Sequence, residues 1–208
     1  MSLVIFDHPL IKHKVALLRD KDTCTNQFRV LIEEITTLMA YEALNDVPTK
    51  TVEINTPLET TTQTMIMENS VAIIPVLRAG LGMVNGIHTL LPTAKVGHIG
   101  MYRDHETLQP KEYYCKLPEN IAEKVCIIID PMLATGGSAV AAIDLLKKQG
   151  CKKIKLMNII AAPIGVETVQ KAHPDVQIYV AQMDRCLNEH GYILPGLGDA
   201  GDRIFGTK

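Results

Sequence analysis

The sequence has no excess of charge of one sign. Its 21 lysines and arginines nearly balance 23 aspartates and glutamates, which gives a formal net charge of −2. A protein that binds nucleic acid over a broad surface usually carries a basic excess. The balance therefore argues against nucleic acid as a partner, although it leaves room for one local anion pocket.

The sequence also lacks the cysteine spacing of a zinc site or a disulfide framework. Its cysteines are odd in number, widely scattered and free of C-x-x-C pairs: Cys24, Cys115, Cys126, Cys151 and Cys186. Scattered thiols of this kind are typical of reduced, buried cysteines rather than of disulfides. We therefore expect a cytoplasmic protein.

Long hydrophobic runs and composition breaks are absent too. No apolar run approaches the roughly 18 residues of a transmembrane helix, and no basic segment with an apolar core opens the chain. With 208 residues and 47% hydrophobic content, the chain can bury one substantial core. We expect no membrane contact and one domain over residues 1–208.

The most informative stretch is residues 125–138, Val-Cys-Ile-Ile-Ile-Asp-Pro-Met-Leu-Ala-Thr-Gly-Gly-Ser. Val125–Ile129 is typical of a buried parallel strand, and a helix is predicted over Ala139–Gln149. Asp130 would then lie at the carboxyl end of a strand, where open α/β sheets bind ligands. Residues 134–138 are small or carry hydroxyls, and they form the turn at which this helix begins. The stretch therefore predicts a monophosphate site.

An ordinary tight turn with Ser138 as a helix N-cap is the structural alternative. It leaves the carboxylate at the strand end unexplained. The spacing matches neither a P-loop nor the Gly-x-Gly-x-x-Gly turn of dinucleotide-binding proteins. These mismatches argue against a kinase or a dehydrogenase.

A second buried strand, Val71–Leu77, ends at a cation followed by small residues, Arg78-Ala79-Gly80. Arg78 therefore occupies the same kind of strand-end position as Asp130. A cation there could hold a second anionic group, with N–H groups of the loop helping. The alternative is a surface arginine in a turn.

Hydrophobic spacing elsewhere predicts helices that alternate with strands, which indicates a parallel α/β sheet with helices on both faces. Helices are expected over Leu10–Arg19, after Thr25 and over Gly165–Ala172, and strands over Lys95–Met101, Ile154–Ala161 and Gln177–Ala181. Residues 48–67 predict a strand or hairpin outside the main sheet. The polar segments 102–114 and 188–203 show neither the hydrophobic period of a helix nor that of a strand, so both are expected to be functional loops.

Residues 125–138 resemble the phosphoribosyl-pyrophosphate (PRPP) motif of type I phosphoribosyltransferases: a hydrophobic strand, an acid, then Ala-Thr-Gly-Gly-Ser. Most of that family has two adjacent acids where this chain has Asp130-Pro131, a departure that resembles the uracil phosphoribosyltransferase branch. Residues 192–203, Tyr-Ile-Leu-Pro-Gly-Leu-Gly-Asp-Ala-Gly-Asp-Arg, resemble the base-binding signature of that branch. The resemblance covers essentially the whole chain. It implies the type I phosphoribosyltransferase fold with an N-terminal helical/β appendage and a C-terminal base-binding hood.

The resemblance also implies a transferase that forms UMP and pyrophosphate from uracil and PRPP, with Mg²⁺ bound mainly through PRPP and water rather than by a protein metal site. The implied catalytic residues are Asp130, Arg103 and Asp199. The implied PRPP-binding residues are Arg78, Arg103, Asp130, Pro131, Met132, Leu133, Ala134, Thr135, Gly136, Gly137, Ser138 and Asp199. The implied uracil-binding residues are Ile193, Gly198, Asp199 and Ala200. Arg103 would contact pyrophosphate from a loop that closes over the sugar, and Lys111 is a second candidate there.

Several points stay open at the level of sequence. Either Asp199 or a water could take the uracil proton. The family includes homo-oligomers, dimers or higher, and members that GTP activates. Two other functions remain as alternatives: a regulator that binds RNA on the same fold, for which clustered Lys and Arg are lacking, and a phosphoribosyltransferase for another base.

Overall fold

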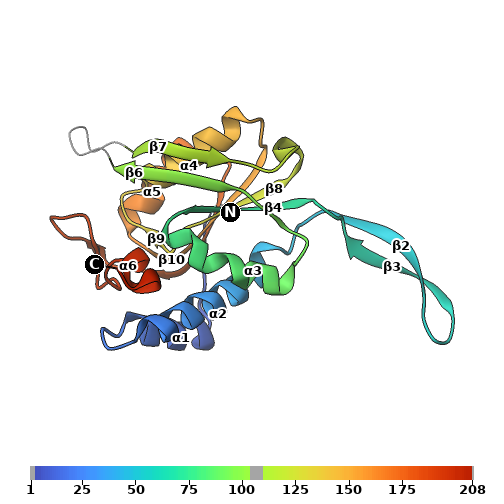
Figure 1. Ribbon diagram of the computed structural model, residues 1–208, viewed down its shortest axis with the longest axis horizontal. Helices are drawn as coiled ribbons and strands as arrows, with labels where there is room; N and C mark the ends of the chain where they lie inside the picture. Colours follow the sequence, from blue (N-terminus) through green and yellow to red (C-terminus); the bar gives the residue numbers. More distant parts are fainter. Residues whose placement is uncertain (1–2, 104–109, 208) are drawn as a thin grey trace.

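The computed structural model describes residues 3–103 and 110–207 (Figure 1). Within these residues the strands form a main sheet of nine strands and two separate two-stranded sheets. The main sheet runs β1-β11-β10-β8-β4-β6-β7, with β5 beside β4 and β9 beside β10. Its strands are β1 (Leu3–Ile5), β4 (Val71–Leu77), β5 (Lys95–Val96), β6 (His98–Arg103), β7 (Pro110–Lys116), β8 (Val125–Ile129), β9 (Met132–Leu133), β10 (Lys153–Ala161) and β11 (Gln177–Met183).

The helices cover both faces of the main sheet. In Figure 1, α1, α2 and α3 lie on one side of it, and α4 and α5 lie on the other. The α-helices are α1 (Pro9–Arg19), α2 (Thr25–Ala43), α3 (Val84–Leu90), α4 (Gly137–Lys148), α5 (Pro163–Ala172) and α6 (Ala200–Phe205), and short 3₁₀ helices span Ala79–Met83 and Ile121–Glu123. No helix of the described residues is long and apolar enough to cross a membrane.

The alternation of side chains along the central strands divides the interior into two cores. On β4, Ile73 packs into the core beneath α1, α2 and α3, whereas Ile74 packs into the core shared with α4 and α5. The helix expected after Thr25 is α2, and its apolar stripe is buried in the first core, from Phe28 to Met39, with Leu38 at its margin. Because β4 and β8 are buried on both faces, their near-continuous apolar sequences are those of central parallel strands.

The prediction of a parallel sheet is confirmed for the central strands. β4 and β8 have the predicted bounds, and each pairs in parallel with its neighbours. Two edge features were not predicted. Leu3–Ile5 pairs in parallel with β11 as an edge strand, and β7 runs antiparallel to β6.

The hairpin predicted outside the main sheet is confirmed. β2 (Thr49–Asn55) and β3 (Thr60–Ile66) pair only with each other, and they project far from the body of the molecule (Figure 1). Most of its side chains are exposed, and Leu58 at the turn is 96% exposed. A lone two-stranded hairpin is only marginally stable in water, so an arm of this length needs a further contact to become rigid.

Two predicted loops contain regular structure. In the segment 102–114, predicted as a loop, residues 102–103 end β6 and residues 110–114 belong to β7. The backbone of β7 pairs with β6 although its side chains are largely exposed. In 188–203, β13 (Ile193–Leu194) pairs with β12 (Cys186–Leu187), and residues 200–203 belong to α6. The loop prediction is wrong at these positions because backbone pairing and capping require no hydrophobic period.

Candidate active site

The predicted phosphate loop connects the carboxyl end of β8 to the first turn of α4. After Asp130, the carbonyl of Pro131 accepts hydrogen bonds from the N–H groups of Ile159 and Ile160, both at 3.0 Å. The chain then pairs with β10 again as β9. Residues 130–133 are therefore attached to the sheet rather than suspended as a free loop.

Glycines allow this loop to pack tightly against the start of α5. Gly136 has φ +87°, and a Cβ there would lie 2.7 Å from the carbonyl oxygen of Gly165. A Cβ on Gly165 would in turn lie 2.4 Å from the carbonyl oxygen of Ala134. Both positions therefore require glycine, the first for its left-handed backbone as well.

The first turn of α4 is open to a ligand. Gly136 occupies the N-cap position and no side chain caps the helix, so the alternative in which Ser138 is an ordinary N-cap is wrong. Thr135 and Ser138 are both exposed beside this turn. Uncapped N–H groups and hydroxyls at the N-terminus of a 12-residue helix form a favourable anion site.

Asp130 is a partly buried carboxyl group at the strand end. Its Oδ1 accepts a hydrogen bond from the N–H of Met132 at 3.2 Å. Burial raises the pKa of Asp130 to about 7, the hydrogen bond from Met132 opposes this shift, and the nearby charge of Asp199 adds to it. The carboxyl group therefore changes charge near neutral pH.

Asn158 on β10 holds the backbone of Asp130, a role that was not predicted from the sequence. Its side chain is 1% exposed, and its Nδ2 donates to the backbone carbonyl of Asp130 at 2.7 Å. Its Oδ1 has no hydrogen-bond partner among the described residues. A pocket of about 100 Å³ lies between the sheet and the phosphate loop, and both Asp130 and Asn158 line it. The one sequence signal is a lone amide in the otherwise apolar run 156–162.

Arg78 lies where it was predicted, directly after β4, and it is exposed. Its Nη2 donates to Asp202 Oδ1 at 3.1 Å and its Nη1 to Thr207 Oγ1 at 3.4 Å. The bond from Thr207, followed by that from Arg78, holds the pKa of Asp202 below its usual value. Arg78 is thus joined to the C-terminal segment rather than pointing freely into solvent.

Asp199 brings the C-terminal segment to the same edge of the sheet. It is the N-cap of α6, and its Oδ1 accepts from the N–H of Asp202 at 2.9 Å. A Cβ on Gly201 would lie 3.2 Å from Asp199 Oδ1 and 3.7 Å from Arg78 Nη2. Arg78, Asp130 and Asp199 therefore surround one region beside the phosphate loop.

The predicted base-binding residues lie between β13 and the first residue of α6. The side chains of Ile193 and Ala200 are buried in the core, while Gly198 is exposed with φ +82°. Because those two side chains face the interior, the groups that this part of the loop can offer to a ligand are mainly backbone N–H and C=O groups.

Arg203, the other cation of this segment, is occupied. Its guanidinium donates to the carbonyls of Leu18, Leu197 and Asp20 and lies 4.3 Å from the ring centroid of Phe28. Burial lowers the pKa of Arg203 somewhat, opposed by Asp20. Arg203 thus holds the loop against α1 instead of facing the site.

Two predicted residues lie on the β6–β7 hairpin. Arg103 ends β6, three residues beyond Gly100, which is paired with Leu77 beside Arg78. Only the backbone of Arg103 is described, and residues 104–109 lie outside the described part of the chain. Lys111 is exposed on β7. Among the described residues, no group of three His, Cys, Asp or Glu side chains could hold a metal ion alone.

Comparison with known proteins gives one consistent result. The family model described as uracil phosphoribosyltransferase matches residues 4–207. Curated proteins named uracil phosphoribosyltransferase include one from Clostridioides difficile, 62% identical over 100% of both chains, and one from Finegoldia magna, 60% identical over 100% of this chain and 99% of its own.

Solved structures agree with the fold. The AQ2163 protein from Aquifex aeolicus is 39% identical, with a TM-score of 0.93 over 98% of this chain and 97% of its own. Adenine phosphoribosyltransferase from Trypanosoma brucei is 12% identical, with a TM-score of 0.62 over 95% and 88% of the two chains, and shares the fold alone. Taken with the strand-end carboxylate, the open helix N-terminus and the C-terminal loop at one edge of the sheet, these matches show that the chain belongs to the uracil phosphoribosyltransferase family.

Proposed function

We propose that the protein is a pentosyltransferase that transfers ribose 5-phosphate from PRPP to uracil, giving UMP and pyrophosphate in pyrimidine salvage. Membership of the family over nearly the whole chain supports this activity. The observation that carries it furthest is the convergence of the phosphate loop, Asp130, Arg78 and the loop 193–200 at one edge of the sheet.

The 5-phosphate of PRPP would bind at residues 134–138. The N–H groups of the uncapped first turn of α4, with the hydroxyls of Thr135 and Ser138, would donate to its oxygens. The phosphate loop would be positioned by the backbone pairing of Pro131, Met132 and Leu133 with β10.

Asp130 would accept hydrogen bonds from the ribose hydroxyls and stabilise the positive charge that develops on the sugar ring. Only its ionised form can do both. With a pKa of about 7 in the ligand-free protein, a large fraction of the Asp130 carboxyl groups is ionised at neutral pH.

Arg78 and Arg103 would neutralise the departing pyrophosphate from the ends of β4 and β6. The ion pair of Arg78 with Asp202 is exposed and therefore weak, so the guanidinium can exchange this partner for a phosphate oxygen. Thr207, which bonds both residues, would keep Asp202 satisfied afterwards.

The donor set fits Mg²⁺ that arrives bound to PRPP. Asp199 is an exposed carboxylate and Asp130 lies close enough to feel its charge, and carboxylates and water are ligands that this hard cation prefers. The ion would neutralise charge on the pyrophosphate. Asp199, or a water, would then accept the proton that uracil loses.

Uracil would be recognised by Ile193, Gly198, Asp199 and Ala200. Since Ile193 and Ala200 bury their side chains, their backbone N–H and C=O groups would pair with the carbonyls and the N3–H of the base. A phosphoribosyltransferase for another base is disfavoured by the names of the curated relatives. An RNA-binding regulator is disfavoured by the balanced charge.

We further infer that the protein works in the cytoplasm as a homo-oligomer, a dimer or higher, with residues 1–208 as one domain. Free thiols throughout the chain are consistent with that compartment. The projecting arm β2–β3, with exposed Leu58 and Met65, offers a surface that another copy could cover.

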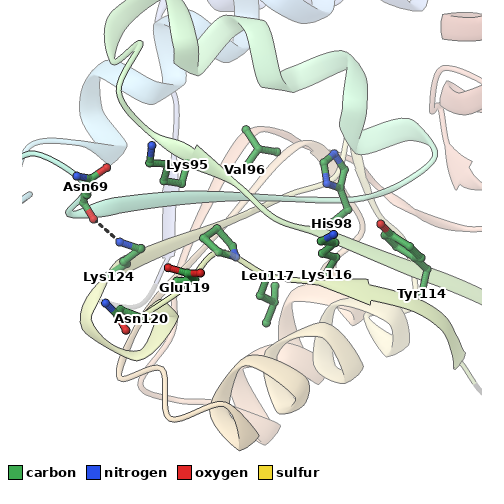
Figure 2. Close-up of a pocket in the computed structure, with 11 residues that line it drawn as sticks. Asn69, Lys95, Val96, His98, Tyr114, Lys116, Leu117, Glu119, Asn120 and Lys124 are labelled. Carbon is green, nitrogen blue, oxygen red and sulfur yellow. Dashed lines mark hydrogen bonds between the residues drawn. The ribbon is translucent and has the colours of Figure 1, made fainter.

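The proposal extends to allosteric activation by GTP, which fits a cleft at the opposite edge of the sheet. Lys95, His98, Lys116 and Lys124 line this cleft of about 850 Å³ together with Tyr114 and one acid, Glu119 (Figure 2). It lies at the amino ends of β5 and β8, whereas Asp130 follows the carboxyl end of β8. The size of this cleft and its lysine side chains suit a nucleoside triphosphate.

The activity is tested by incubating the purified protein with PRPP, Mg²⁺ and each free nucleobase in turn and measuring nucleotide and pyrophosphate. Uracil should be consumed with equimolar UMP and pyrophosphate. Consumption of a purine, or no PRPP-dependent product with any base, would contradict the proposal.

A further inference from the structure

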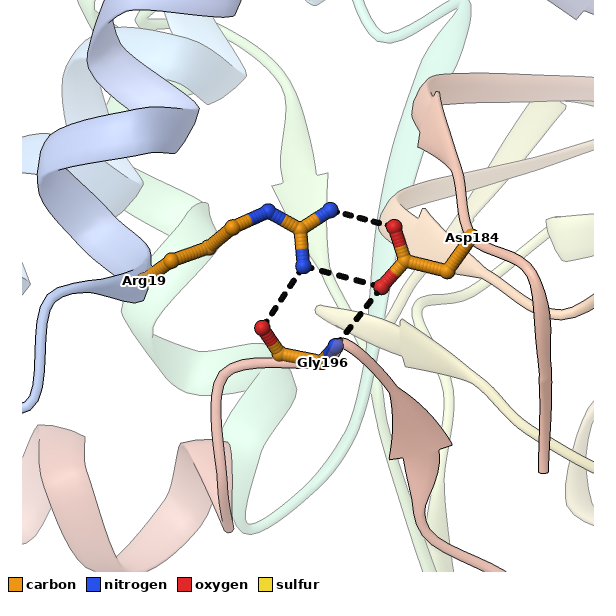
Figure 3. A network of polar contacts seen from close by, with 3 residues as sticks. All are labelled: Arg19, Asp184 and Gly196. Carbon is orange, nitrogen blue, oxygen red and sulfur yellow. Dashed lines mark hydrogen bonds and ion pairs between the residues drawn. The ribbon is translucent and has the colours of Figure 1, made fainter. Parts of the chain in front are cut away.

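The base-binding loop is fastened to the end of α1 by a buried ion pair. Arg19 is the last residue of α1, and its Nη1 donates to Asp184 Oδ2 at 2.9 Å while its Nη2 donates to Asp184 Oδ1 (Figure 3). The Asp184 side chain is 1% exposed and that of Arg19 is 16% exposed. Two opposite charges at this depth persist only when their remaining hydrogen-bonding groups are also satisfied.

Gly196 satisfies both members of the pair. Its carbonyl accepts from Arg19 Nη1 at 2.6 Å, and its N–H donates to Asp184 Oδ2 at 2.9 Å (Figure 3). Gly196 has φ +68°, and a Cβ there would lie 2.1 Å from the carbonyl oxygen of Ile193. The ion pair therefore holds a peptide whose conformation only glycine allows, within the loop proposed to contact uracil.

The next residue of the loop is fixed to the same place. The carbonyl of Leu197 accepts from Arg203 Nη1, and the same guanidinium binds the carbonyls of Leu18 and Asp20. The carboxyl end of α1 is thus bonded to Gly196 directly through Arg19, and to Leu197 indirectly through the guanidinium of Arg203. Asp184 is itself anchored, since its N–H donates to the carbonyl of Ala161 on β10 at 2.8 Å.

We propose that Arg19 and Asp184 are positioning residues for the base: their pair sets the backbone of residues 193–200 so that its N–H and C=O groups meet uracil. This inference rests on the proposed function. The pair contacts none of the phosphate loop residues through the bonds described for it. Its loss should therefore weaken uracil binding and leave PRPP binding largely unchanged.

The test compares Asp184→Asn and Arg19→Lys with the wild type. In Asp184→Asn, the new side chain can still accept the Gly196 N–H, but its amide would place a donor against the Arg19 guanidinium. In Arg19→Lys, the lysine retains charge toward Asp184, but it lacks the planar fork that reaches Asp184 and Gly196 together. We expect each variant to raise KM for uracil at least tenfold, with Kd for PRPP, measured by calorimetry, within twofold of wild type.

Lys14→Gln is the matched control. Lys14 lies on the same helix and forms an ion pair with Glu34 of α2, with 2.6 Å between Nζ and Oε2. This control should leave KM for uracil within twofold of wild type. Thermal unfolding of each variant checks that it is folded at the assay temperature. If Asp184→Asn does not fold, Arg19→Lys still tests the proposal.

The result separates this inference from the proposed function. If the wild type does not convert uracil, the proposed function fails. If the wild type converts uracil but the folded variants keep KM for uracil within twofold, or lose uracil and PRPP affinity in equal measure, the positioning role of Arg19 and Asp184 is wrong.

Discussion

Among single residues, Asp130 should have the largest effect on the rate of the reaction. Replacing Asp130 by Asn preserves its shape and the hydrogen bond from the Met132 N–H, but removes the charge. Since that charge matters most when the sugar becomes positive, kcat should fall about 10²-fold or more while Kd for PRPP changes only a few fold. Steady-state kinetics and PRPP calorimetry check this, and equal losses in both quantities would refute the role.

The same carboxyl group predicts a pH-dependent stability. Its pKa is raised to about 7 when folded, so the folded state binds more protons than the unfolded state between about pH 4 and pH 7. Stability of the ligand-free protein is therefore lost as pH rises through this window. Asp130→Asn should raise Tm more at pH 8 than at pH 4, and an equal shift at both values would show that burial does not disfavour the charge.

Asn158 shows what residue types alone do not reveal. A single amide inside an apolar strand is visible in the sequence, yet its contact with the Asp130 carbonyl depends on the register between β8 and β10. Arg78 and Asp130 were predictable because strand ends in a parallel sheet share one edge. The Arg78–Asp202 pair joins residues 124 positions apart and required the folded chain.

At the scale of elements, the phosphate loop predicts a specific requirement for Gly136. Ala at this position would force a left-handed backbone and a Cβ contact of 2.7 Å with Gly165 O. Kd for PRPP should rise at least tenfold, with a loss of about 1–3 kcal/mol in the free energy of unfolding.

Gly150→Ala is the control for that prediction. Gly150 ends the turn after α4 with a similar φ of +84°, but its nearest contact is Ala122 Cβ at 3.3 Å, remote from the loop. This variant should lower Tm while leaving PRPP affinity intact. If both variants weakened PRPP binding to the same degree, the loss of affinity would come from backbone strain in general and not from the phosphate loop.

Elements with a strong hydrophobic period were predicted well, and those formed by other forces were not. The apolar spacing of α1 and α2 and the continuous apolar runs of β4 and β8 predicted these elements and their burial. α6 was not predicted because it has only six residues, two of them small, and shows no apolar stripe. The side chain of Asp199 caps its first turn instead. β7 was missed because β6 stabilises it through backbone pairing while its surface stays polar and exposed.

At the scale of the whole molecule, the arm β2–β3 predicts assembly. If another copy covers it, replacing Leu58 and Met65 by Ser should raise the dissociation constant of the oligomer more than tenfold, because exposed apolar area would no longer be buried. Light scattering over a concentration series measures this. Ile164→Ser, an exposed apolar position on α5, is the control, and an unchanged mass for the arm variant would exclude the arm from the interface.

We propose that residues 193–200 recognise uracil through their backbone groups, beside PRPP bound at the carboxyl end of β8. Cytosine presents an amino donor where uracil has O4 and an acceptor where uracil has N3–H, so two buried pairs would clash. Orotate should also be poor, since Arg203 is occupied by backbone carbonyls and cannot pair with its carboxylate.

The most direct test is kcat/KM for uracil, cytosine and orotate at one saturating PRPP concentration. Sites that hydrogen-bond a substrate in this way discriminate by about 10⁴, so uracil should exceed cytosine by that order and orotate by a large factor. Comparable values for uracil and cytosine would contradict recognition by the backbone of residues 193–200.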